Sequence, residues 1–164
     1  MFRKLIFNIL LLCISSNNQL VAQTFYISGD FLNKLELNNN LCSCEYSTIG
    51  YINTNSQGST FAPDGQLYIL VGDTIFQADL STAVKTVFFV GPPGLPNMYG
   101  IVCTEEGIFY TMPSNIPPIS DILYKWDTNA GTVTTIGSTG FAASNGNSGE
   151  LAMQGGKVYR IYKE

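Results

Sequence analysis

The sequence predicts an all-β fold built from repeated, four-stranded antiparallel sheets. The chain of 164 residues contains 16 glycines, nine tyrosines and ten phenylalanines, and only 12% of its residues are charged. This composition is typical of turn-rich β proteins. Short apolar runs are separated by turn residues, and one strand-turn-strand segment occurs three times. Such a recurrence indicates a repeat architecture, in which each copy of the segment belongs to one structural unit.

The first 22 residues predict a secretory signal peptide. Arg3 and Lys4 precede an apolar run at 5–14, and a polar stretch then ends at Ala22 and Gln23. The run holds about ten residues, whereas a helix that spans a membrane needs about 20. We therefore expect cleavage after Ala22 or Gln23, and no transmembrane segment.

We expect bacterial export that leaves a secreted or cell-surface protein, residues 23–164, without a lipid anchor. Cys13 ends the apolar run, but Leu12 before it is not the small residue that bacterial lipidation requires. Loss of Arg3 and Lys4 leaves six basic against 12 acidic residues, a net charge of −6. Such a chain repels phosphate backbones, so we expect no nucleic-acid partner.

Composition also limits the chemistry. The chain contains no histidine, which excludes serine and cysteine hydrolases that need a histidine base, and metal sites with histidine ligands. Paired-carboxylate chemistry stays open, although no spacing pairs two acids. Cys42, Cys44 and Cys103 remain in the mature chain. The sequence leaves their pairing undecided between one disulfide and three small buried side chains, and it gives little support to a zinc site.

The repeat begins with the segment 58–68, which aligns without gaps with 100–110 and 149–159. Each copy has a glycine before the first strand, another in the turn and a tyrosine in the second strand. A third strand follows in each unit, and a fourth strand closes it. The third strands are 32–37, 75–80 and 123–128, and the fourth strands are 46–50, 87–91 and 132–137.

Four strands repeated every 42 to 49 residues predict the blades of a β-propeller. A lone four-stranded sheet cannot cover its two apolar faces, so blades pack face to face around a central axis. Glycine at the start of a first strand suits the crowded axis. A sandwich or barrel would explain the strands but not the repeat.

The strand count predicts a propeller fragment of about three four-stranded blades plus a partial one. The mature chain starts at a second strand, 25–27, and its last segment is again a second strand. Because propellers close with about four to eight blades, we expect the domain 23–164 to be incomplete. It would be part of a longer protein, or it would pair with further blades or another chain.

The segment 60–68, Thr-Phe-Ala-Pro-Asp-Gly-Gln-Leu-Tyr, resembles the strand-turn-strand of NHL-type and lactonase-like propellers. The segment 124–137 is similar to the uncharacterised propeller-like repeats of secreted bacterial surface proteins. The resemblance implies the fold, which serves unrelated functions. We expect a binding or scaffold module without catalysis, with a protein or glycan ligand at the cell surface. The alternative is a divalent-cation-dependent, lactonase-like hydrolase, whose first-strand glutamate only Glu150 matches.

Several acidic and aromatic residues are expected to have structural roles. Trp126 occupies a third-strand position that is Leu35 or Ala78 in the other repeats, so we expect it in the core rather than in a sugar-stacking platform. Four acids are expected to serve turns: Asp64, Asp79, Glu106 and Asp127.

One candidate site follows from topology. Asp30, Asp73 and Asp121 each precede a third strand, so stacked blades would arrange them as an arc on one face. The loops containing 92–94 and 145–147 would lie beside them. Carboxylates with amide and carbonyl oxygens suit calcium, so the pattern predicts weak calcium binding there. The alternative is that Gly-Asp simply favours a tight turn.

Overall fold

The computed structural model describes residues 23–27, 30–37, 44–52, 57–113, 121–140 and 150–161. The predicted signal peptide, Cys13, Cys42, Gly149 and the loop 145–147 lie outside these residues. Within the described ranges, no helix is long and apolar enough to cross a membrane.

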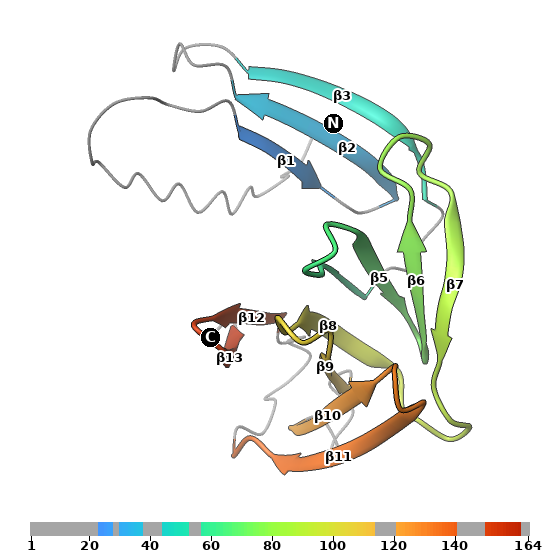
Figure 1. Cartoon of the computed structure of the whole chain (residues 1–164), viewed down its shortest axis with the longest axis vertical. Coiled ribbons are helices and arrows are strands. Elements are labelled where there is room, and N and C mark those ends of the chain that lie inside the picture. Colours follow the sequence, from blue (N-terminus) through green and yellow to red (C-terminus); the bar gives the residue numbers. More distant parts are fainter. Residues whose placement is uncertain are drawn as a thin grey trace, which may run out of the picture.

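Thirteen strands are described, and they form four antiparallel sheets. The sheets, taken in chain order, are named blades 1 to 4 (Figure 1). Blade 1 contains β1 (Gln23–Ile27), β2 (Phe31–Leu37) and β3 (Cys44–Tyr51), and blade 2 contains β4 (Gly58–Phe61), β5 (Leu67–Val71), β6 (Thr74–Ala78) and β7 (Lys85–Val90). Blade 3 contains β8 (Met98–Cys103), β9 (Phe109–Pro113), β10 (Ile122–Asp127) and β11 (Thr132–Ser138), and blade 4 contains β12 (Glu150–Gln154) and β13 (Lys157–Ile161).

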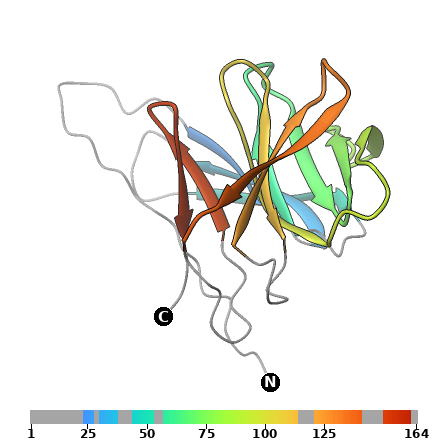
Figure 2. The ribbon, with the colours of Figure 1, turned by 90° about the horizontal axis from the view of Figure 1, so that it is seen from below.

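The sheets hold three, four, four and two strands in sequence order. This arrangement confirms the predicted fold class, a β-propeller fragment. Figure 1 shows the blades as an arc, with blade 1 at one end and blade 4 at the other. Figure 2 shows the tips of the hairpins β4–β5, β8–β9 and β12–β13 together on one side. We call this side the hairpin face, and the opposite side, with the connections β5–β6 and β7–β8, the loop face.

The apolar core lies between blades rather than within any one of them. Leu32 and Ile52 of blade 1 pack against Leu67, Ile69 and Ala78 of blade 2. On its other face, blade 2 packs against blade 3 in a second cluster. That cluster contains Tyr68, Leu70, Ile75, Met98, Ile101, Cys103, Phe109 and Trp126. Side chains alternate between the two faces of each strand, so one blade contributes to two interfaces.

Trp126 confirms its predicted structural role. It is fully buried between blades 2 and 3, and its indole N–H donates a hydrogen bond of 2.8 Å to the hydroxyl of Thr111. Because the ring has no exposed surface, it cannot stack on a sugar.

The axis is crowded where the sequence predicted it. A Cβ atom added to Gly58 would lie 3.1 Å from the Cα atom of Gly100, the equivalent glycine of the next blade. The N–H of Gly100 also donates to the carbonyl of Gln57 at 2.9 Å. Glycine therefore lets the two innermost strands approach backbone to backbone.

The third copy of the repeat differs in register. In blade 2, Ala62 pairs with Gln66 around a three-residue turn, and in blade 3 a turn of the same length pairs Thr104 with Ile108. In blade 4, the pairing of Gln154 with Lys157 leaves only two residues in the turn.

Two glycines explain the shorter turn. Gly155 and Gly156 have φ values of 56° and 72°, as a two-residue hairpin requires. One residue fewer reverses the sides of the second strand. Tyr159 therefore lies on the side of its sheet with Ala152, whereas Tyr68 lies on the side with Thr60, the equivalent of Leu151. The gap-free alignment of these two tyrosines is wrong as a statement about structure.

Candidate functional site

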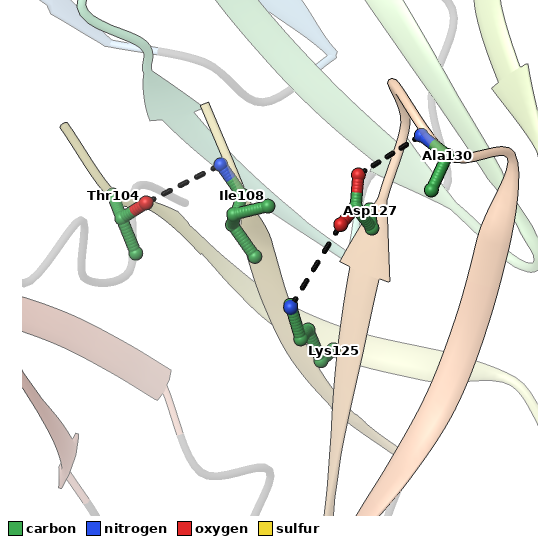
Figure 3. A network of polar contacts seen from close by, with 5 residues as sticks. All are labelled: Thr104, Ile108, Lys125, Asp127 and Ala130. Carbon is green, nitrogen blue, oxygen red and sulfur yellow. Dashed lines mark hydrogen bonds and ion pairs between the residues drawn. The ribbon is translucent and has the colours of Figure 1, made fainter. Parts of the chain in front are cut away.

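The carboxylates of the hairpin face are bound within their own turns. Asp64 accepts one bond from the amide of Gln66 at 2.9 Å and another from the Tyr68 hydroxyl at 2.8 Å. In blade 3, Asp127 accepts a bond of 3.0 Å from the amide of Ala130 and lies 3.8 Å from the Lys125 ammonium (Figure 3). Such bonds are the ordinary chemistry of tight turns.

Asp79 performs the same role in blade 2. Its carboxylate accepts bonds from the hydroxyl and the amide of Ser81 and from the amide of Thr82. These bonds favour the ionised form and lower the pKa of Asp79 to about 2. In blade 3, a bond with Thr104 likewise lowers the pKa of Glu106. The predicted turn roles of Asp64, Asp79, Glu106 and Asp127 are confirmed.

The loop face presents one aspartate per blade at an equivalent place. The main-chain carbonyls of Asp30, Asp73 and Asp121 accept bonds from the amides that follow the outer strands. The donors are Ile52 at 2.9 Å, Gly91 at 2.8 Å and Thr139 at 2.8 Å. The repeat therefore predicted the placement of the three aspartates.

The structure does not gather these aspartates into one group. In the described part of the chain, no three His, Cys, Asp or Glu side chains lie close enough to hold a metal ion. The Asp73 carboxylate accepts a bond of 3.0 Å from the Thr74 hydroxyl, and the Asp121 carboxylate accepts one from the Ser138 hydroxyl. Asp30 and Asp73 are exposed. Calcium binding by the arc stays a prediction.

On the loop face, segments of blades 2 and 3 contact one another. The side-chain oxygen of Gln57 accepts a bond of 2.6 Å from the amide of Gly72. The carbonyl of Gly72 accepts one of 3.3 Å from the amide of Met98. The amide oxygen of Asn97 lies 3.8 Å from the position of a Cβ atom added to Gly72. We call this meeting point the loop junction, and the exposed carboxylate of Asp73 follows it directly.

Sequence reasoning missed Gln57 and Asn97 in this junction. Each lies directly before an innermost strand, β4 or β8. The repeat aligns Gly58 with Gly100, so Gln57 and Asn97 are not equivalent positions in it. It therefore gave no signal for their contacts with Gly72.

The described cysteines have no partner in a disulfide. Cys103 is buried in the core between blades 2 and 3, and its thiol donates to the carbonyl of Thr104 at 3.5 Å. Burial raises the pKa of this thiol to about 11, which keeps it protonated and unreactive. Cys44 is exposed on β3.

Comparison with known proteins finds similarity among solved structures. No protein-family model and no curated protein sequence matches the chain. A solved structure of virginiamycin B lyase from Staphylococcus aureus is similar at 12% identity and a TM-score of 0.47, over 80% of this chain and 44% of the other. A gluconolactonase from Xanthomonas campestris is similar at 15% identity and a TM-score of 0.46, over 80% and 42%. This chain thus spans less than half the length of either protein, and both are propeller-type folds.

The expectation of a module without catalysis is corrected by this comparison, since both similar structures are enzymes. The absence of histidine excluded histidine-dependent chemistry alone. It did not bear on carboxylates such as Asp73, which need no histidine to accept a proton.

Proposed function

We propose that this chain takes part in the hydrolysis of a cyclic ester, as part of a lactonase-like propeller, and that the loop junction holds the reacting group. The strand-turn-strand at 60–68 and the similarity to a gluconolactonase suggest the reaction class. The observation that carries the proposal is the junction itself, where the Asp73 carboxylate follows the bonded pair Gln57 and Gly72.

The two faces of the arc support this assignment. The hairpin-face acids Asp64, Asp79 and Asp127 are held by their own turns. On the loop face, the side chains of Asp73 and Asn97 are exposed. Propeller folds gather loops from several blades at the end of the axis, so a site there draws on more than one blade.

These residue types suit ester hydrolysis. The carboxylate of Asp73 would accept the proton of the attacking water as its oxygen bonds to the ester carbon. The same proton would then pass to the ring oxygen that leaves when the acyl C–O bond breaks, which opens the ring. The side-chain amide of Asn97 would donate a hydrogen bond to the ester carbonyl oxygen as negative charge develops on it.

The divalent cation that the lactonase-like resemblance implies does not fit the described residues alone. Asp73 and Asn97 offer oxygen ligands of the right type, but no set of three acidic ligands accompanies them in the described ranges. We therefore assign no step to a metal ion.

The test is a screen of the purified chain against lactones and phosphotriesters, with and without added calcium and with a chelator. We expect lactone turnover that falls by about 10²-fold to 10⁴-fold in Asp73→Asn, the usual contribution of a positioned base. The amide of asparagine keeps an oxygen for Thr74, so the fold should persist. Glu105→Gln, an exposed acid in a turn of the hairpin face, is the matched control and should retain full activity. No turnover above buffer, or equal activity of the Asp73→Asn variant, would refute the proposal.

A further inference from the structure

In blades 2 and 3, one face of the sheet is buried by the preceding blade. Ala78 of β6 is fully buried against Leu32 and Ile52 of blade 1. Trp126, at the equivalent position in β10, is fully buried against Leu70 and Ile75 of blade 2. The equivalent residue of blade 1 is Leu35. Among the described residues, no blade precedes blade 1 to cover the face on which Leu35 lies.

The face of blade 1 that no described blade covers is uncharged and largely aromatic. Cross-strand partners lie on the same face of a sheet, and the pairs on this face are Phe31 with Tyr51, Asn33 with Thr48, and Leu35 with Tyr46. None of these six side chains is charged. Phe31 is 49% exposed and Tyr46 is 58% exposed. The rings of Phe31 and Tyr51 lie 5.2 Å apart. Exposed apolar surface of this kind marks an interaction site.

Blade 4 offers the complementary half of a blade-to-blade interface. Leu151 of β12 is equivalent to Val102 of β8. Val102 is buried but belongs to neither described core cluster, and β8 contacts β12. The side of β8 with Val102 therefore faces the following blade. On the same side of blade 4 lie Arg160, as the cross-strand partner of Leu151, and three apolar residues: Leu151, Met153 and Val158, the partner of Met153. All three side chains are only half-buried.

We propose that a second copy of this chain docks head to tail, so that blade 4 of one copy covers the open face of blade 1 of the next. The contact repeats the blade-to-blade packing that the chain builds between blades 1 and 2 and between blades 2 and 3. Blades 1 and 4, which carry the two different halves of this interface, lie at the two ends of the arc in Figure 1. Because the halves differ, the interface is heterologous, and it extends the arc of blades into a ring or an open filament.

The test uses sedimentation velocity on the full chain over a range of concentrations. The wild-type chain should self-associate. Tyr46→Lys on blade 1 and Val158→Lys on blade 4 should each weaken that association by at least about tenfold in Kd, since each would place a charge against apolar side chains of the facing blade. Val87→Lys is the matched control, because Val87 is 61% exposed on β7, an outermost strand away from both faces. This control should associate like the wild type.

An equimolar mixture of the Tyr46→Lys and Val158→Lys variants distinguishes head-to-tail docking from other modes of self-association. Each variant retains the half that the other has lost, so the mixture should form a one-to-one heterodimer that grows no further. Circular dichroism of each variant confirms folding. A wild-type chain that stays monomeric, a mixture that stays monomeric, or a Val158→Lys variant that associates normally would overturn the proposal.

Discussion

Blades 1 and 3 share one repeat, but their equivalent positions lie in opposite environments. Trp126 of blade 3 is fully buried, with its N–H bonded to Thr111. On blade 1, Leu35 occupies that position and its cross-strand partner Tyr46 is 58% exposed. The corresponding partner of Trp126 is Val133, which packs against the core. Burial in this fold is thus supplied by a neighbouring blade, and a single sheet does not provide it.

The largest effect should come from truncation on the buried side of this comparison. Trp126→Ala removes a fully buried indole and its hydrogen bond, so it should lower the free energy of unfolding by about 3–5 kcal/mol. Tyr46→Ala on the exposed side should change it by no more than about 0.5 kcal/mol in the monomer. Urea denaturation at low protein concentration measures both.

Trp126→Phe keeps this comparison testable where the alanine variant does not fold. It retains an aromatic ring but loses the bond to Thr111, for a cost of about 1–3 kcal/mol. Equal costs at positions 126 and 46 would contradict the role assigned to the neighbouring blade.

Gly91 tests how tightly blades 2 and 3 are packed. An added Cβ would lie 2.6 Å from the Cδ1 atom of Leu95, 3.0 Å from the Cη2 atom of Trp126 and 3.1 Å from the carbonyl oxygen of Asp73. Gly91→Ala should therefore cost about 1–3 kcal/mol by overpacking. Val90→Ala, at an exposed neighbouring residue, is the control and should cost clearly less. A neutral Gly91→Ala variant would show that this interface is looser than described.

A smaller effect should appear at alkaline pH through Tyr68. Burial and the bond to Asp64 raise the pKa of Tyr68 to about 12. Because the folded-state pKa lies above the ordinary value of 10.0, the stabilisation is complete below pH 10 and is lost as the pH rises from 10 towards 12. Tyr68→Phe should cost about 1 kcal/mol at neutral pH and flatten the alkaline decline. Denaturation midpoints from pH 7 to pH 12 measure it, and an unchanged alkaline slope would exclude Tyr68 as the source.

The sequence predicted the fold because the repeat couples local turn chemistry to global position. The close approach at Gly58 of β4 and Gly100 of β8 and the apolar position of Trp126 were predicted and are confirmed. The pairing register of β12 and β13 could not be predicted from the sequence alignment. The two-residue turn of Gly155 and Gly156 aligns without a gap with the three-residue turns of blades 2 and 3. Turn length, rather than residue identity, decides which face Tyr159 occupies.

The candidate site was less accessible to sequence reasoning. The equivalent placement of Asp30, Asp73 and Asp121 followed from the repeat. Whether their side chains converge depends on the spacing between blades, which no local pattern encodes, and the structure keeps them apart. Gln57 and Asn97 were missed because their role comes from contact with Gly72 of another segment.

Native-state hydrogen exchange tests most directly the claim that neighbouring blades stabilise each blade. The strands β5, β6, β9 and β10 lie in blades that contribute to the packed cores, and their amides should exchange only with global unfolding. The amides of β2 are also in the middle of a sheet, but no described blade covers one face of that sheet. In the monomer they should exchange through a smaller opening, at a clearly lower free energy. Protection of β2 equal to that of β9 and β10 in a monomeric sample would contradict the account.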